Sequence, residues 1–201
     1  MLGGPPHGHN PGATPAPRPS RLAPMRVVGL LRGVNLGPSR RLKMADLRAA
    51  VASLGHTDVE TYLQSGNVVF TPADRRTKDL GAGITAALAE HVGLDVGVLT
   101  RTGAEMADIV AANPYAREDP TKVVVTFLER AGDAAPADDL DLESFAPEGL
   151  TINGTEIYFD LPFGQARSKL LEALSKRKVF GKVATTRNWR TVLALADMSR
   201  S

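Results

Sequence analysis

Cysteine is absent from the 201-residue chain, and histidine is scarce, with only 4 residues. Without cysteine the chain has no disulfide framework, no thiolate zinc site and no cysteine nucleophile. No apolar run approaches the roughly 20 residues that a membrane-spanning helix needs. The signatures G-x-G-x-x-G, G-x-x-x-x-G-K-[ST], G-x-S-x-G and H-E-x-x-H are missing as well. We therefore predict no metal site, no resident cofactor and no membrane partner.

The segment 1–24 has almost no apolar residues to bury, although it holds 7 of the 14 prolines. Such a composition cannot offset the entropy lost on ordering, so we predict a disordered leader. It also lacks the apolar stretch of a secretory signal, which favours a cytoplasmic location. Met25 opens the first patterned segment, which leaves Met1 and Met25 as alternative start residues.

The formal charge of +2 comes from Arg18 and Arg21 in this leader, and the rest of the chain is neutral. Within the rest, charge is uneven: residues 118–160 carry 2 basic and 11 acidic side chains, and 161–201 carry 9 and 2. Local fields guide a partner more than net charge does. The two regions either face each other within one fold or attract a partner of opposite charge.

Residues 25–101 have the pattern of a ferredoxin-like α+β unit. Apolar runs predict strands at 27–31, 59–63, 67–71 and 96–99, and apolar residues at helical spacing predict helices from Met44 and Leu80. The resulting order, βαββαβ, matches the split βαβ plan.

Residues 102–201 predict a second, small α+β unit with an antiparallel hairpin. Thr102 and Glu105 have the spacing of a capping box, and 123–128 is a nearly continuous apolar strand. Asn153-Gly154 is a strong hairpin signal between two further strands. Two helices follow, the last of them opening at about Thr185–Arg190. The two units show no sequence repetition.

His56 and His91 are the only histidines outside the leader. Each lies near a predicted helix C-terminus, where the helix dipole favours a positive side chain. We interpret both as capping residues.

Three polar clusters at the ends of predicted elements are candidates for a binding site, since sites are commonly built there. The first cluster is a glycine-containing loop after the first strand, where exposed backbone N–H groups and nearby cations favour an anion. The second cluster forms a hairpin turn, and the third lies at the starts of two predicted helices. The candidate ligand-binding residues are Arg32, Asn35 and Lys43 in the first, Gln64, Ser65 and Asn67 in the second, and Arg167, Lys169, Thr186, Arg187, Asn188, Trp189 and Arg190 in the third.

Each cluster also has a plain structural interpretation. The glycines of the first loop suit a turn with solvated cations, and the second cluster has ordinary turn residues. At the last helix, Thr186 or Asn188 would cap the helix while Trp189 packs in the core.

The same segments resemble a bacterial family known as domain of unknown function 1697. The strings RVVGLLRGVNLGPSRRLKMADLRAAVASLG, VETYLQSGNVVF, EIYFDLPFGQARSKL and ATTRNWRTVLAL carry the likeness, which covers about residues 25–198. The resemblance implies an α+β fold with a ferredoxin-like half and no established activity. Residues 38–41 depart from the pattern usual in relatives, which leaves the shape of that loop open.

We therefore weigh three functions. The first is a binding protein for an anionic ligand, either a phosphorylated small molecule or a nucleic-acid backbone, at a composite of the three clusters. The second is a transferase or hydrolase acting on a phosphorylated substrate in the same pocket, for which Asp46 and Glu60 are the nearby carboxylates. The third is a structural or self-associating protein in which the acidic 118–160 region contacts a basic surface. The oligomeric state is not determined by the sequence.

Overall fold

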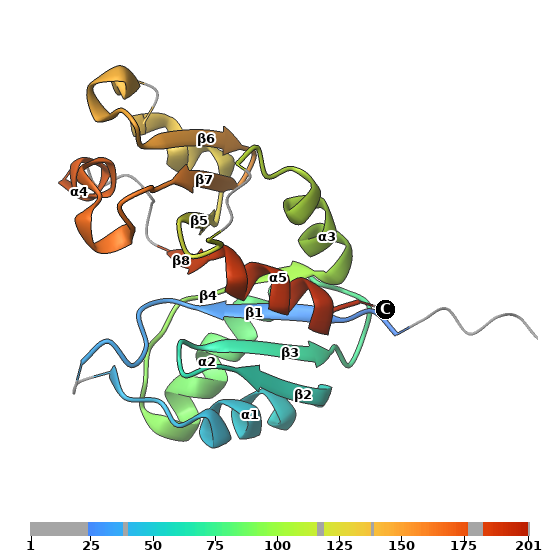
Figure 1. Ribbon diagram of the computed structural model, residues 1–201. Coiled ribbons are helices and arrows are strands. Elements are labelled where there is room, and N and C mark those ends of the chain that lie inside the picture. Colours follow the sequence, from blue (N-terminus) through green and yellow to red (C-terminus); the bar gives the residue numbers. More distant parts are fainter. Residues whose placement is uncertain (1–23, 38–39, 116–118, 138, 177–182, 201) are drawn as a thin grey trace, which may run out of the picture.

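The computed structural model describes residues 24–37, 40–115, 119–137, 139–176 and 183–200. The chain forms two four-stranded antiparallel sheets, one above the other in Figure 1. The fold is therefore α+β, as predicted. The predicted disordered leader, apart from Pro24, lies outside the described residues.

The first sheet has the order β2-β3-β1-β4 and carries two helices on one face. Its elements follow the predicted βαββαβ order. They are β1 (Val27–Leu31), α1 (Met44–Ser53), β2 (Thr57–Tyr62), β3 (Asn67–Thr71), α2 (Leu80–Val92) and β4 (Val98–Thr102). Helix α3 (Gly103–Ala111) follows β4 directly, and the predicted capping box of Thr102 and Glu105 begins it.

The second half contains a four-stranded sheet, one strand more than the strand 123–128 and the hairpin predicted for it. Its order is β6-β7-β5-β8. Its elements are β5 (Val123–Leu128), the 3-10 helices η2 (Ala131–Ala137) and η3 (Leu142–Phe145), β6 (Gly149–Asn153), β7 (Glu156–Asp160), η4 (Gln165–Arg167), α4 (Lys169–Lys176), β8 (Ala184–Asn188) and α5 (Trp189–Met198).

The two halves share one topology. In each sheet the strand order is second, third, first, fourth, and the fourth strand leads into a helix, α3 or α5. The strand registers also correspond, because Arg101 pairs with Val28 of β1 and Arg187 pairs with Val125 of β5. The fold is therefore an internal structural repeat that sequence comparison within the chain does not detect.

Successive side chains of a strand point to opposite faces of its sheet, so they pack in different parts of the core. Val27 and Leu31 of β1 pack with α1 and α2, whereas Val28 and Leu30 face α3, α5 and the second sheet. Helix α5 lies between the two sheets in Figure 1. The face of the second sheet that points away from the first is covered by α4 and the β5–β6 connection. The halves thus share one central apolar layer.

Strand β8 corrects the prediction that a helix opens at Thr185. Residues 184–188 form a strand, and α5 begins at Trp189. The strand is hard to find from sequence because its inward residues, Thr185 and Arg187, are polar yet buried. The β6–β7 hairpin is confirmed, but its two turn residues are Gly154 and Thr155, since Asn153 still pairs with Glu156.

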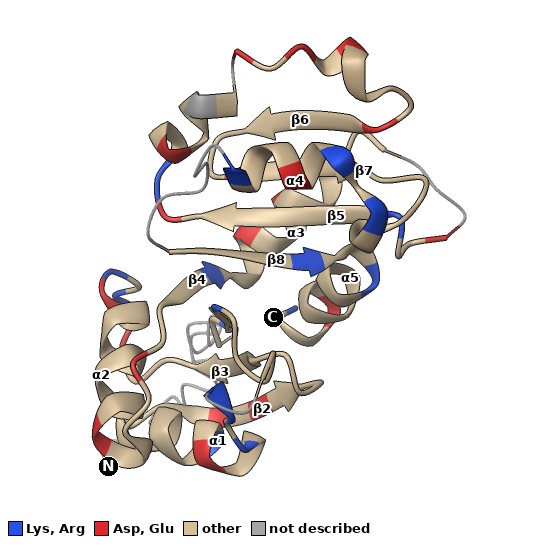
Figure 2. Ribbon diagram, turned by 90° about the vertical axis from the view of Figure 1, so that its left-hand side faces the viewer, with Lys and Arg blue, Asp and Glu red and all other residues tan. Residues whose placement is uncertain are grey.

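The β5–β6 connection carries much of the acidic charge of the second half. Figure 2 shows its red segments above β6, at the end of the molecule farthest from α1 and α2. Within the described part of the chain, no helix is long and apolar enough to cross a lipid bilayer.

Candidate functional site

Arg187 of β8 is buried, with 7% of its surface exposed, and it donates hydrogen bonds to both halves of the fold. Its Nε donates to Oδ1 of Asn67. One terminal nitrogen donates to the Leu31 carbonyl at 2.9 Å and to the carbonyls of Ser65 and Gly66 at 3.1 and 3.2 Å. The other donates to the hydroxyl of Thr185 and the carbonyl of Thr186. All five N–H groups of the guanidinium are therefore used inside the protein.

All the hydrogen-bond acceptors around Arg187 in the described structure are neutral. Burial lowers the pKa of Arg187 to about 10, because removal from water disfavours the charged form. The equivalent residue of the first half, Arg101, bonds the Leu128 carbonyl and, at 2.8 Å, the carboxylate of Glu156. Asn67 stands in the register position of Glu156, so of the two equivalent arginines only the half-buried Arg101 has a carboxylate partner.

Arg187 links the predicted turn cluster to the 185–188 part of the third cluster, and it also bonds the residue that precedes the first cluster, at the end of β1. Arg167 and Lys169 of the third cluster lie elsewhere, at the start of α4. Since its donors are occupied, Arg187 supplies positive charge behind the turn rather than a direct contact with a ligand. Asn67 is equally engaged, because its amide donates to the Tyr62 carbonyl and the Ser65 hydroxyl.

Asn35 fastens the β1–α1 loop to the same turn. Its side-chain nitrogen donates to the Gln64 carbonyl at 2.6 Å and the Leu42 carbonyl at 3.0 Å, and its Oδ1 accepts the Leu42 N–H. The backbone of Asn35 has φ +57°, a left-handed conformation that asparagine tolerates better than most residues. These hydrogen bonds connect the β1–α1 loop to the 64–66 turn through Asn35. The residues next to Asn35 line an open groove.

The groove has a volume of about 890 Å³ and runs between the loop, the turn and the start of α1. It is lined by Asn35, Leu36, Gly37, Arg41, Leu42, Lys43, Asp46, Gln64 and Val92. Arg41 and Lys43 are exposed, and in the described structure neither side chain has a hydrogen bond or ion pair. Lys43 is also the N-cap residue of α1 and makes no side-chain cap bond.

Arg32 and Arg40 lie in a second cleft, of about 850 Å³, on the α2 and β4 side of the same loop. Asp95 and Glu129 line it too, so the cations there have acidic neighbours. The groove holds one carboxylate, Asp46, beside its two cations. The groove is therefore more electropositive than the cleft of Arg32 and Arg40.

The predicted anion site at Arg167 and Lys169 is already occupied by the protein. The carboxylate of Glu148 accepts from the Ser168 hydroxyl at 2.7 Å and from the backbone N–H groups of Lys169 and Leu170. This helix start does bind an anion, and that anion belongs to the chain itself.

The remaining predicted residues have structural roles. Thr186 bonds the hydroxyl of Thr126 at 2.8 Å, and Asn188 caps α5 by accepting the Thr191 N–H. Trp189 packs against the central apolar layer, as predicted. Arg190 is exposed on α5 and helps to lower the pKa of Asp119, although the hydrogen bonds from Thr121 contribute most to that shift.

The interpretation of His56 as a helix cap is wrong, whereas His91 does lie in the last turn of α2. His56 follows α1, but its Nδ1 accepts the Ala73 N–H and its ring stacks on Phe70. Among the described residues, no group of three or more His, Asp or Glu side chains could hold a metal ion.

Comparison with known proteins places the chain in a family and a fold. The structure of a conserved bacterial protein, SP0830 from Streptococcus pneumoniae, superposes with a TM-score of 0.66 at 22% identity, covering 88% of this chain and 99% of that one. At that identity the likeness concerns the fold alone. No curated protein matches the chain. A family model described as protein of unknown function (DUF1697) matches residues 25–158, and the chain belongs to that family.

Proposed function

We propose that the chain binds a phosphorylated small molecule in the groove between the β1–α1 loop, the 64–66 turn and the start of α1. The observation that carries the proposal is the buried charge of Arg187, which has only neutral partners and lies against the turn that borders the groove. A buried charge in a low-dielectric interior acts over a longer range than a solvated one.

The charge of Arg187 lies behind the turn, of which Gln64 lines the groove, and the peptide groups of the turn are oriented by it. The carbonyls of Ser65 and Gly66 point at the guanidinium. In a trans peptide the N–H points the opposite way from the carbonyl, so the N–H groups of Gly66 and Asn67 have their positive ends directed away from Arg187. The free end of α1 adds a partial positive charge beside Lys43.

A small molecule fits the groove better than a nucleic-acid strand does. A volume of about 890 Å³ is in the range of small-molecule pockets. Single-stranded nucleic acids are usually held by stacking on exposed aromatic rings. Leu36 and Val92 line the groove instead, and they suit an apolar part of a compact ligand.

Calorimetric titration with ribose 5-phosphate tests the proposal. We expect saturable binding that weakens about tenfold or more in Lys43→Gln, since one charge-assisted hydrogen bond is worth about that much. Arg75→Gln is the matched control, because Arg75 is an exposed cation outside the groove. Equal weakening in both variants, or tighter binding of a single-stranded RNA than of the sugar phosphate at low salt, would contradict the proposal.

A second candidate, hydrolysis or transfer of the phosphoryl group, is favoured by one observation. Asp46 lines the same groove as the two cations, and its carboxylate would act as the general base for an attacking water in hydrolysis or for an acceptor hydroxyl in transfer. Phosphorus NMR of the same samples separates the two functions. Binding alone shifts the ribose 5-phosphate signal, whereas hydrolysis adds an inorganic phosphate signal that Asp46→Asn abolishes.

A further inference from the structure

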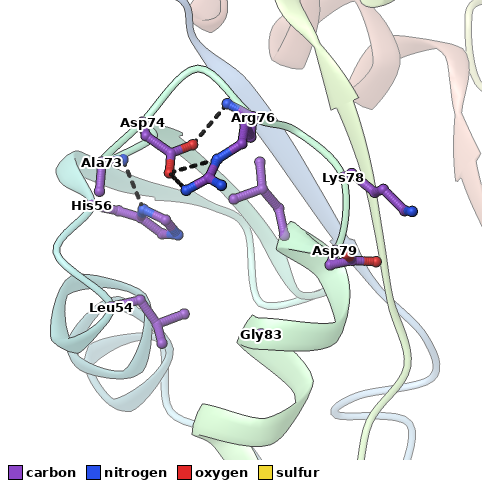
Figure 3. Close-up of a pocket in the computed structure, with 9 residues that line it drawn as sticks. Leu54, His56, Ala73, Asp74, Arg76, Lys78, Asp79 and Gly83 are labelled. Atoms are coloured by element: carbon purple, nitrogen blue, oxygen red, sulfur yellow. Dashed lines mark hydrogen bonds and ion pairs between the residues drawn. The ribbon is translucent and has the colours of Figure 1, made fainter.

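A third cavity, separate from the groove and from the cleft of Arg32 and Arg40, lies at the opposite end of α1 (Figure 3). It has a volume of about 490 Å³ and is bounded by the end of α1, the loop after β3 and the start of α2. Its lining is Leu54, His56, Ala73, Asp74, Arg76, Lys78, Asp79, Leu80 and Gly83. Leu54, Ala73, Leu80 and Gly83 form the apolar part of this lining, and the other five residues are polar or charged, among them the buried imidazole of His56.

The imidazole of His56 is held in one orientation. Only 8% of the residue is exposed, its ring stacks on Phe70 with centroids 4.7 Å apart, and its Nδ1 accepts the Ala73 N–H at 3.1 Å. Because Nδ1 is the acceptor, the proton of the neutral ring is on Nε2. Figure 3 shows Nε2 directed into the space between Leu54 and Gly83. In the described structure Nε2 has no hydrogen-bond partner.

The charged groups near His56 come from the loop after β3 and the start of α2. Asp74 and Arg76 form a 2.8 Å ion pair at the exposed rim, so their charges largely cancel. Lys78 and Asp79 also belong to the lining, and Figure 3 shows their side chains extending to the side away from His56. Asp79 is the N-cap residue of α2 but makes no side-chain cap bond. The positive end of the α2 dipole therefore borders the cavity without a capping side chain.

We propose that this cavity binds a short aliphatic carboxylate. The carboxylate accepts the Nε2–H of His56 near the start of α2, and the aliphatic chain covers Leu54, Leu80 and Gly83. Small-molecule sites usually combine apolar lining with a few fixed polar groups, and here Leu54, Leu80 and Gly83 supply the first and His56 supplies one of the second. The inference is independent of the groove, so either site can fail without the other.

The titration of His56, followed by imidazole NMR, tests the proposal with isovalerate and its neutral isostere isovaleramide. Burial lowers the pKa of His56 in the empty protein, against a smaller opposing effect of Asp74. A carboxylate beside Nε2 stabilises the imidazolium form, so saturating isovalerate should raise the pKa of His56. Isovaleramide carries no charge and should leave the pKa unchanged or lower it further by excluding water.

Two leucine substitutions separate filling of the cavity from a general effect on the fold. Gly83 has room for a side chain, since an added Cβ would lie 3.9 Å from Leu54 Cδ1. Gly83→Leu should fill the cavity and abolish binding while favouring the helix. Gly132→Leu is the control, because a Cβ there meets nothing within 4 Å and Gly132 belongs to η2 of the second half rather than to the lining of the cavity. His56→Gln should weaken isovalerate binding about tenfold or more.

The proposal is overturned if millimolar isovalerate leaves the pKa of His56 unmoved, or if Gly83→Leu binds isovalerate as tightly as the unmodified chain. The first measurement needs no variant, so misfolding of His56→Gln would not remove the test. Circular dichroism of each variant checks that the overall helical content is retained.

Discussion

Replacing Arg187 by methionine should destabilise the protein by about 2–4 kcal/mol. The side chain keeps its approximate length, but the hydrogen bonds that Arg187 itself donates to the first half are lost. The Gly66 carbonyl still accepts the Leu31 N–H, and the Leu31 carbonyl still accepts the Thr185 hydroxyl. The Asn67 Oδ1 and the Ser65 carbonyl lose the donor that the structure gives them.

The magnitude follows from these two acceptors. A buried acceptor left without a donor costs about 1–3 kcal/mol, so two of them cost about 2–6 kcal/mol. The variant also removes a charge whose burial is unfavourable, as the lowered pKa of Arg187 shows, and this relief reduces the total. Loss of stability should couple to Asn67: in a double-mutant cycle with Asn67→Ala, the two effects should be non-additive by about 1 kcal/mol or more.

Urea unfolding followed by the fluorescence of Trp189, the only tryptophan, measures the change. Arg190→Met is the control, because Arg190 is an exposed cation of the adjoining helix. If the free energy of unfolding of Arg187→Met lies within about 0.5 kcal/mol of that of the unmodified protein, the hydrogen bonds of Arg187 do not hold the two halves together.

Three further predictions concern other buried groups. Burial raises the pKa of Tyr158 to about 12. Because this phenol ionises more readily in the unfolded state, the free energy of unfolding should fall as the pH rises above about 10. In urea titrations Tyr158→Phe should lose less stability over the same pH range. Because burial lowers the pKa of His56, stability should fall as pH drops below about 6.5 towards the folded-state pKa, and His56→Phe should flatten this dependence of the melting temperature. Glu148→Gln should cost about 1–2 kcal/mol by weakening the carboxylate contacts at the start of α4, measured by urea unfolding; a change below about 0.3 kcal/mol would show that this carboxylate is dispensable.

The local elements of the fold were predictable from sequence because apolar periodicity and cap residues record them. The strand 123–128 and the capping box at Thr102 match the structure, since both depend on neighbours in the chain. Strand β8 was missed because its inward residues are satisfied by distant polar groups rather than by apolar packing. One short signal of the repeat is present: Thr100-Arg101-Thr102 precedes α3 as Thr186-Arg187-Asn188 precedes α5.

The candidate site was predictable only as a set of segments. Glycines and polar residues at element ends indicated the 32–43 loop and the 64–67 turn, and the structure brings them together. The sequence could not show that Arg187 is buried and saturated, because that depends on carbonyls more than a hundred residues away. The cavity beside His56 left no signal, since a lone histidine after a helix has the same pattern whether it caps, packs or binds.

The most direct test of the groove is a map of backbone amide shifts in the NMR spectrum on addition of ribose 5-phosphate. We predict the largest amide shifts at Lys43, Met44, Gln64 and Gly66, around the start of α1 and the 64–66 turn. Shifts centred on α4 or on the second sheet, or no shifts at saturating sugar phosphate, would contradict this prediction.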